Sequence, residues 1–234
     1  MLRQLATAWH REAVKRNDER LYRAAEESYR LCIDTFPSGP HRYFMTFYYG
    51  ELLFKRGKWQ AAADAYAWVV RSRPNGGKHL LAAAYAHVMA VRKATKSPRP
   101  LTISFPKKRP FSKDRAKLLA AYELYIRHVK KSPDLPPILY RAARMYYVHG
   151  RLAEAVKRFG RLVDKHPGCS LSQYAANLLL DCLNIQRRYA EMKVWVDRML
   201  ASPKIARGQL LPLLKKLKAD LARRAAAAAK KPKP

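Results

Sequence analysis

The sequence predicts an all-α fold in which pairs of helices repeat along the chain to form a helical-hairpin solenoid. Two stretches, residues 49–74 and 142–167, match each other position by position in small, aromatic, glycine and proline residues. Apolar residues recur at helical spacing, and the alternation of apolar and polar residues typical of strands is confined to residues 101–105. These observations predict about five repeats, followed by a C-terminal helix that caps the array.

Each signature residue of the two stretches has a physical role in a helix pair. A small residue on each helix lets the two axes approach closely, and an aromatic residue fills the space beside them. A glycine permits the left-handed conformation that ends the first helix, and a proline stops the second. In chain order, these residues are Gly50, Gly57, Ala62, Tyr66 and Pro74 in the first stretch and Ala143, Gly150, Ala155, Phe159 and Pro167 in the second.

This signature resembles that of the tetratricopeptide repeat, a helix–turn–helix unit of about 34 residues. The same template, placed on Pro37, Pro133 and Pro203, indicates three further repeats, of which the last matches least well. Residues 140–167 and 174–203 also resemble parts of large repeat proteins of the bacterial cell envelope. The resemblance implies stacked helix pairs whose first helices line a concave groove for a protein or peptide partner.

The spacing of the prolines places an insertion in the third repeat. Pro74 and Pro133 lie 59 residues apart, whereas the other spacings between closing prolines are 34, 36 and 37. The extra residues, 96–112, hold four prolines, which favour an extended path over a helix. We therefore expect four segments. They are a solenoid over residues 1–203, with a basic, proline-rich insertion at 96–112; a capping helix over 204–224, periodic from residue 209; and a low-complexity basic tail over 225–234.

The chain is strongly basic, with 48 Lys and Arg residues against 17 Asp and Glu and a formal net charge of +31 at pH 7. Residues 1–37 are nearly neutral, whereas residues 204–234 hold ten basic side chains and one acidic side chain. A field of this kind attracts acidic proteins and polyanions, although a basic composition also occurs on chains that bind nothing charged. A second concentration of charge, in and beside the insertion, comprises Lys107, Lys108, Arg109, Lys113 and Arg115.

The first helix of each pair supplies the candidate partner-binding residues of the groove. Aromatic and arginine side chains suit a peptide that carries apolar anchors and carboxylates, since arginine can bind a carboxylate through two hydrogen bonds. The competing interpretation, that the aromatic members pack between repeats, stays open from the sequence. The candidates are Phe47, Glu51, Phe54 and Lys55 in the second repeat, Tyr140, Arg141, Arg144 and Tyr147 in the fourth, and Asn177 in the fifth.

The sequence shows no pattern of catalytic or metal-binding chemistry. Its seven histidines are scattered, and HExxH, GxSxG and glycine-rich phosphate-loop motifs are absent. Cys32, Cys169 and Cys182 have no metal-binding spacing, and Cys32 and Cys182 occupy apolar helical positions that predict core residues. We therefore expect a non-catalytic scaffold without cofactor or metal that binds a protein or peptide. The alternative is nucleic-acid binding through the basic insertion and C-terminal segment.

No signal peptide or membrane-spanning window is evident in the sequence. As the sequence stands, this predicts a cytoplasmic protein. If the chain is a fragment of an exported protein, the predicted compartment is instead the periplasm or cell envelope. The identity of the partner and the oligomeric state are not indicated by any motif.

Overall fold

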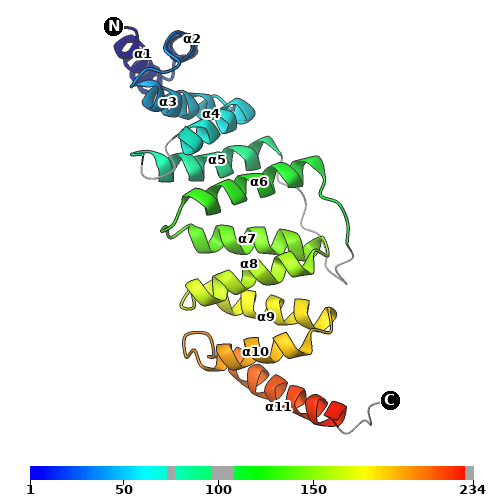
Figure 1. Ribbon diagram of the computed structural model, residues 1–234. Helices are drawn as coiled ribbons and strands as arrows, with labels where there is room; N and C mark the ends of the chain where they lie inside the picture. Colours follow the sequence, from blue (N-terminus) through cyan, green and yellow to red (C-terminus); the bar gives the residue numbers. More distant parts are fainter. Residues whose placement is uncertain (73–76, 96–107, 230–234) are drawn as a thin grey trace. The chain divides into compact units, whose positions relative to one another are not determined.

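The computed structural model describes residues 1–72, 77–95 and 108–229, and every regular element in them is an α-helix. The helices are α1 (Leu2–Arg16), α2 (Glu19–Thr35), α3 (Arg42–Lys55), α4 (Trp59–Ser72), α5 (Leu80–Ala94), α6 (Lys113–His128), α7 (Leu135–Val148), α8 (Leu152–Lys165), α9 (Ser170–Ile185), α10 (Tyr189–Leu200) and α11 (Leu210–Ala229). They form five consecutive pairs followed by one further helix, so the predicted all-α repeat fold is confirmed (Figure 1).

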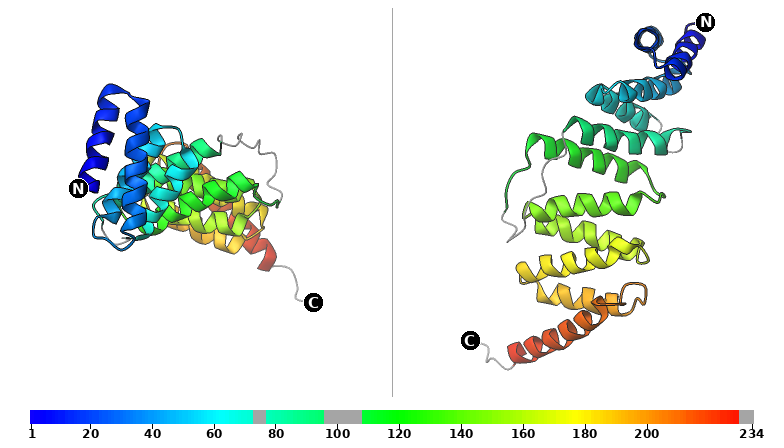
Figure 2. Two further views of the ribbon diagram at one scale, coloured as in Figure 1. Left: turned by 90° about the horizontal axis from the view of Figure 1, so that it is seen from above. Right: turned by 180° about the vertical axis from the view of Figure 1, so that it is seen from behind.

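The chain divides into two compact units, with α1 to α6 in the first and α7 to α11 in the second. Within each unit, successive helices lie side by side, as Figure 1 and the view from behind in Figure 2 both show. Each helix therefore buries its apolar face against its neighbours in sequence, as a repeat array requires. Of the described residues between α5 and α6, 108–110 belong to the second unit and 95, 111 and 112 to the first.

The signature residues occupy the positions that the template predicts. Gly57 and Gly150 have φ angles of +73° and +66°, so each supplies the left-handed turn between the two helices of its repeat. The small and aromatic positions of the second helices are buried in four repeats, and the apolar position is buried in three of them, since His128 of the third repeat is half-buried. Pro74, the closing proline of the second repeat, lies outside the described residues. The buried set is Ala25, Tyr29 and Cys32; Ala62, Tyr66 and Val69; Ala121 and Tyr125; and Ala155, Phe159 and Leu162.

Several helix boundaries follow from capping rather than from the repeat template. Asp18 accepts a hydrogen bond from the backbone N–H of Arg20 at 2.8 Å and begins α2. Asn17 and Arg187, with φ angles of 51° and 54°, take the left-handed role in turns that lack glycine. The C-terminal helix runs to Ala229, five residues beyond the expected end at residue 224.

Close approach of helices depends on two glycines. A Cβ at Gly50 would lie 2.9 Å from the Tyr66 ring, and a Cβ at Gly160 would lie 2.7 Å from the Trp195 ring. The first contact joins α3 to α4 within a repeat, as the sequence predicted for Gly50. The second joins α8 to α10, the second helices of neighbouring repeats, and the sequence template did not identify it.

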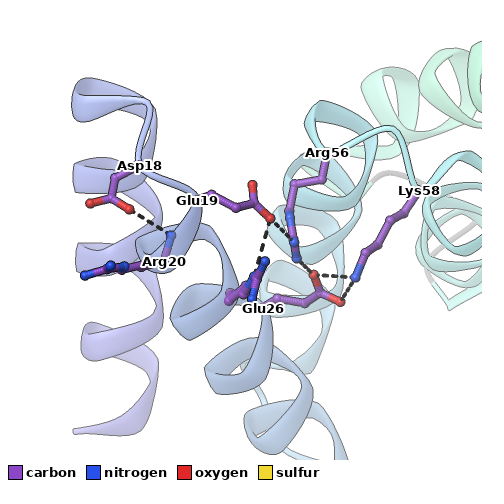
Figure 3. A network of polar contacts seen from close by, with 7 residues as sticks. Asp18, Glu19, Arg20, Glu26, Arg56 and Lys58 are labelled. Carbon is purple, nitrogen blue, oxygen red and sulfur yellow. Dashed lines mark hydrogen bonds and ion pairs between the residues drawn. The ribbon is translucent and has the colours of Figure 1, made fainter.

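An ion network joins the first two repeats (Figure 3). Arg56, in the turn after α3, contacts the carboxylates of Glu19 and Glu26 on α2. The Glu26 carboxylate also receives the Lys58 ammonium at 2.6 Å. The side chains of Arg56 and Glu26 are only 12% and 18% exposed, so solvent screens this pair less than an ordinary surface pair.

The last described residues of the insertion do not stand apart from the repeats. The backbone N–H of Arg109 donates a hydrogen bond to the carbonyl oxygen of His149 at 3.1 Å, in the turn between α7 and α8. Ser112 then begins α6 by accepting a bond from the backbone N–H of Arg115. Residues 96–107, which make up most of the predicted insertion, lie outside the described residues.

We predict that Gly160→Ala lowers the free energy of unfolding by about 1–2 kcal/mol, because overpacking against the rigid Trp195 ring outweighs the better helix propensity of alanine. In a Trp195→Leu background, the same substitution is expected to be neutral or stabilising by up to about 1 kcal/mol. Thermal and urea melts followed by circular dichroism measure both values. Equal effects in the two backgrounds would show that Trp195 does not set the contact.

We also predict that Arg56→Met, which keeps the aliphatic stem, destabilises the protein by about 1–3 kcal/mol because Glu19 and Glu26 lose a charged hydrogen-bond donor. The matched control is Arg23→Met. Arg23 pairs with Glu19 at 3.7 Å, and its side chain is 71% exposed, so its removal should change stability by less than about 0.5 kcal/mol. Urea melts that gave the same loss for both variants would contradict this role of Arg56.

Candidate first-helix groove

The four candidates on α3 have different environments. Phe47 is buried, and its ring stacks on His79 with centroids 4.1 Å apart. Phe54 is half-buried and contacts the edge of Trp59 at 4.9 Å. Glu51 and Lys55 are exposed. The expectation that Phe47 lines the groove is therefore corrected, because the start of α5 covers its ring.

Glu51 lies at the centre of a small polar cluster. Its carboxylate accepts a hydrogen bond from the Tyr66 hydroxyl at 2.5 Å. Burial, and then this hydrogen bond, raise the pKa of Tyr66 above its ordinary value. Burial lowers the pKa of His10 and that of His79, and the negative charge of Glu51 acts against this shift at both rings.

Two adjoining hollows lie between α1 and α3 in the first unit. One, of about 490 Å³, is lined by Thr7, His10, Arg11, Val14, Tyr29 and Tyr48. The other, of about 470 Å³, is lined by Arg3, Gln4, Thr7, His41, Phe44, Met45 and Tyr48. Because Thr7 and Tyr48 line both hollows, we treat them as one surface, the first-helix groove. The sequence template identified α1 as a first helix but gave no groove residue on it, since α1 carries no signature residue.

The groove combines positive charge with aromatic rings. Arg3 bonds to the His41 ring at 3.0 Å, and Arg11 is exposed and makes no hydrogen bond or ion pair with the described part of the chain. His10 shares a 3.1 Å hydrogen bond with the Tyr29 hydroxyl. Burial lowers the pKa of His10, so His10 is mostly uncharged at pH 7, whereas Arg3 and Arg11 carry positive charge in the groove. Arginine beside exposed aromatic edges can bind a carboxylate and an apolar side chain together.

The five candidates of the second unit also divide into buried and exposed residues. Tyr147 is buried and donates a hydrogen bond to the Asp181 carboxylate at 2.5 Å, so it is corrected from groove to core. Tyr140 is half-buried beside Phe159. Arg141, Arg144 and Asn177 are exposed. A residue that the sequence analysis missed, Tyr174 on α9, is 62% exposed. Burial raises the pKa of Tyr140, the charge of Arg144 lowers it, and Tyr174 raises it further.

The predicted basic patch is divided by the structure. Lys107 lies outside the described residues. Lys108 and Arg109 are exposed in the second unit, whereas Lys113 and Arg115 begin α6 in the first. The described members of the patch are therefore divided between the two units, and the patch stays a prediction.

The described residues were searched for metal-binding side chains and for free thiols. No three His, Cys, Asp or Glu side chains come together there as a metal site. Cys32 and Cys182 are buried free thiols, as predicted, and Cys169 is a half-buried free thiol. Across the described ranges, no helix combines the length and apolar character needed to cross a membrane.

One comparison with known proteins matches part of the chain to a family. Residues 138–168, from α7 through α8 into the following turn, match the family model of the tetratricopeptide repeat. A solved structure found by the search is that of a tetratricopeptide repeat protein from Parabacteroides merdae, with 14% identity and a TM-score of 0.45 over 97% of this chain and 76% of that chain. No curated protein matches the chain. The chain is a protein of repeated helical hairpins, and the hairpin at residues 138–168 is a tetratricopeptide repeat by its match to the family model.

We predict that the protein loses stability as the pH falls below 6.5, the ordinary pKa of histidine. Burial lowers the folded-state pKa of His10, so the unfolded chain binds the proton more tightly, and the stability that this group contributes above pH 6.5 is lost on acidification. His10→Gln should make the fall in melting temperature between pH 7 and 5 shallower. Proton NMR of the His10 ring should give a midpoint below 6.5, and a midpoint above that value would contradict the prediction.

Proposed function

We propose that the protein is a non-catalytic scaffold that binds an acidic peptide, or an acidic segment of a protein, in the first-helix groove. The observation that carries the proposal is the pair of adjoining hollows between α1 and α3, which place Arg3 and Arg11 beside Phe44 and Tyr48. Tetratricopeptide repeats form extended surfaces that bind other proteins, and the matched repeat at residues 138–168 supports this class of function.

The lining of the groove favours a particular partner chemistry. Arg11 forms no ion pair with the residues that the structure describes, so a carboxylate of a partner would gain a charge-assisted hydrogen bond there. Thr7, Phe44 and Tyr48 offer contact area for an aliphatic or aromatic side chain. Glu51 adds a single negative charge near His10, which would disfavour a partner that is acidic along its whole length.

The nucleic-acid alternative rests on charge alone. Lys108, Arg109 and Lys113 are exposed, and residues 230–234 of the basic tail lie outside the described residues. We propose the protein or peptide partner first, because the hollows between α1 and α3 bring arginine and aromatic side chains together.

A displayed library of random nine-residue peptides tests the proposal. We predict that selection on the full chain enriches peptides with Asp or Glu beside a Leu, Phe or Trp, and that Arg11→Ala and Tyr48→Ala each weaken the selected peptide about tenfold or more, as truncation of interface anchors commonly does. Fluorescence polarisation measures the affinities.

The matched controls are Arg127→Ala and Leu31→Ala, which remove an exposed cation from α6 and a 55% exposed apolar side chain from α2. Both should leave the affinity within about twofold, as expected of residues outside an interface. Selection of peptides without acidic residues, or equal losses in the control variants, would reject the groove as the binding surface.

A further inference from the structure

The second unit has too few acids to balance its bases, and each acid already has a partner. Its described residues contain six carboxylates: Glu154, Asp164, Asp181, Glu191, Asp197 and Asp220. All except Asp181 form ion pairs. The pairs are Glu154 with Arg158, Asp164 with Arg198, Glu191 with Arg188, Asp197 with Lys218 and Asp220 with Arg223. Asp181 accepts the hydrogen bond of Tyr147. Several exposed cations of this unit, among them Lys157, Arg161 and Lys165, form no ion pair with these carboxylates in the described residues.

Three of these cations form a row along α8. Lys157, Arg161 and Lys165 are four residues apart, so they share one helix face and succeed one another about 6 Å along its axis. All three are exposed, and none forms an ion pair with any residue that the structure describes. The acids nearest in sequence, Glu154 and Asp164, are occupied by Arg158 and Arg198. We call these three residues the α8 row.

The contact between α10 and α8 brings Arg198 to Asp164, the acidic residue beside the α8 row. The Trp195 ring packs against Gly160, and the Arg198 guanidinium lies over that ring at 4.8 Å. From this position Arg198 reaches the Asp164 carboxylate at 3.2 Å. An acid that could have neutralised Arg161 or Lys165 is thereby bound from the neighbouring repeat.

More positive charge lies near the C-terminal end of the row. The Lys204 side chain comes within 4.0 Å of the Cβ position of Gly168, in the turn that follows α8. His166, in the same turn, has its pKa lowered by burial and then by the charge of Arg161. At neutral pH, therefore, His166 is uncharged, and the positive charge at this end of the row comes from Arg161, Lys165 and Lys204.

We propose that the α8 row, with Lys204, is a surface that binds the phosphate backbone of double-stranded nucleic acid without reading its sequence. Evenly spaced, exposed cations suit a polyanion whose charges repeat along a line, and counterion release supplies the affinity. A single strand would need exposed rings on which bases stack. On this face, Phe159 is buried and the Trp195 ring lies beneath Arg198. The surface is separate from the first-helix groove and does not depend on its function.

The test uses the full chain and a fluorescein-labelled 20-base-pair DNA duplex of random sequence, with anisotropy measured between 50 and 200 mM salt. The variant Lys157→Ala/Arg161→Ala/Lys165→Ala removes the row at exposed helix positions, where alanine favours the helix. If each side chain neutralises one phosphate, the slope of log K against log salt should become shallower by about 2.7. The charge-conserving variant Lys157→Arg/Arg161→Lys/Lys165→Arg should keep the slope of the parent chain.

A matched control separates the row from net charge. Lys15→Ala/Arg20→Ala/Arg127→Ala also removes three exposed cations, all from the first unit, and should leave the slope within about 0.5 of the parent value. An equal change in the control, or an unchanged slope in the row variant, would overturn the proposal. So would tighter binding to vesicles of anionic phospholipid than to the duplex, with the same dependence on the row. Circular dichroism of each variant shows whether the fold is retained. If the triple alanine variant unfolds, the single variants Lys157→Ala, Arg161→Ala and Lys165→Ala test the row, and each should make the slope shallower by about 0.9.

Discussion

The structure depends on close contact between helices at positions where no side chain intervenes. At Gly50 the Tyr66 ring takes the space of a Cβ, and at Gly160 the Trp195 ring does the same. The first contact fixes a helix pair, and the second fixes one repeat on the next. Because interiors are packed at near-crystalline density, these two contacts limit how the neighbouring helices can turn. The face that each helix presents to solvent, and hence to a partner, follows from that constraint.

Most of the fold could be predicted because the repeat signature consists of packing and turn requirements. Small residues, a wedge-shaped aromatic residue and a left-handed glycine leave few alternatives to a helical hairpin, and all of them are local in sequence. The fifth pair was predicted with the weakest match, since Glu191 and Arg198 replace the small and apolar residues of the template. Its remaining aromatic residue, Trp195, is the one that makes the contact with Gly160.

The candidate site could be predicted only in part, because a helix face is assigned by what packs on it. Phe47 belongs to the core since His79, from the next repeat, stacks on its ring. Tyr147 also belongs to the core, because its hydroxyl donates a hydrogen bond to Asp181, which lies two helices further along the chain. Neither partner can be found by placing a template on one repeat. The groove itself involves α1, whose residues carry no signature, so no pattern in the sequence could have identified Arg11 as a lining residue.

Net charge likewise says little until the acids are assigned to partners. In the first unit, Arg56 binds Glu19 and Glu26, and Lys58 binds Glu26. These ion pairs hold the first two repeats together. In the second unit, Asp164 is bound by Arg198 across a helix contact, and the neighbouring Arg161 and Lys165 form no ion pair with any residue that the structure describes. A composition of +31 could have been spread as isolated charges of small local effect. The pairing pattern instead leaves positive charge along one exposed helix face, where several cations act within one screening length on the same ligand.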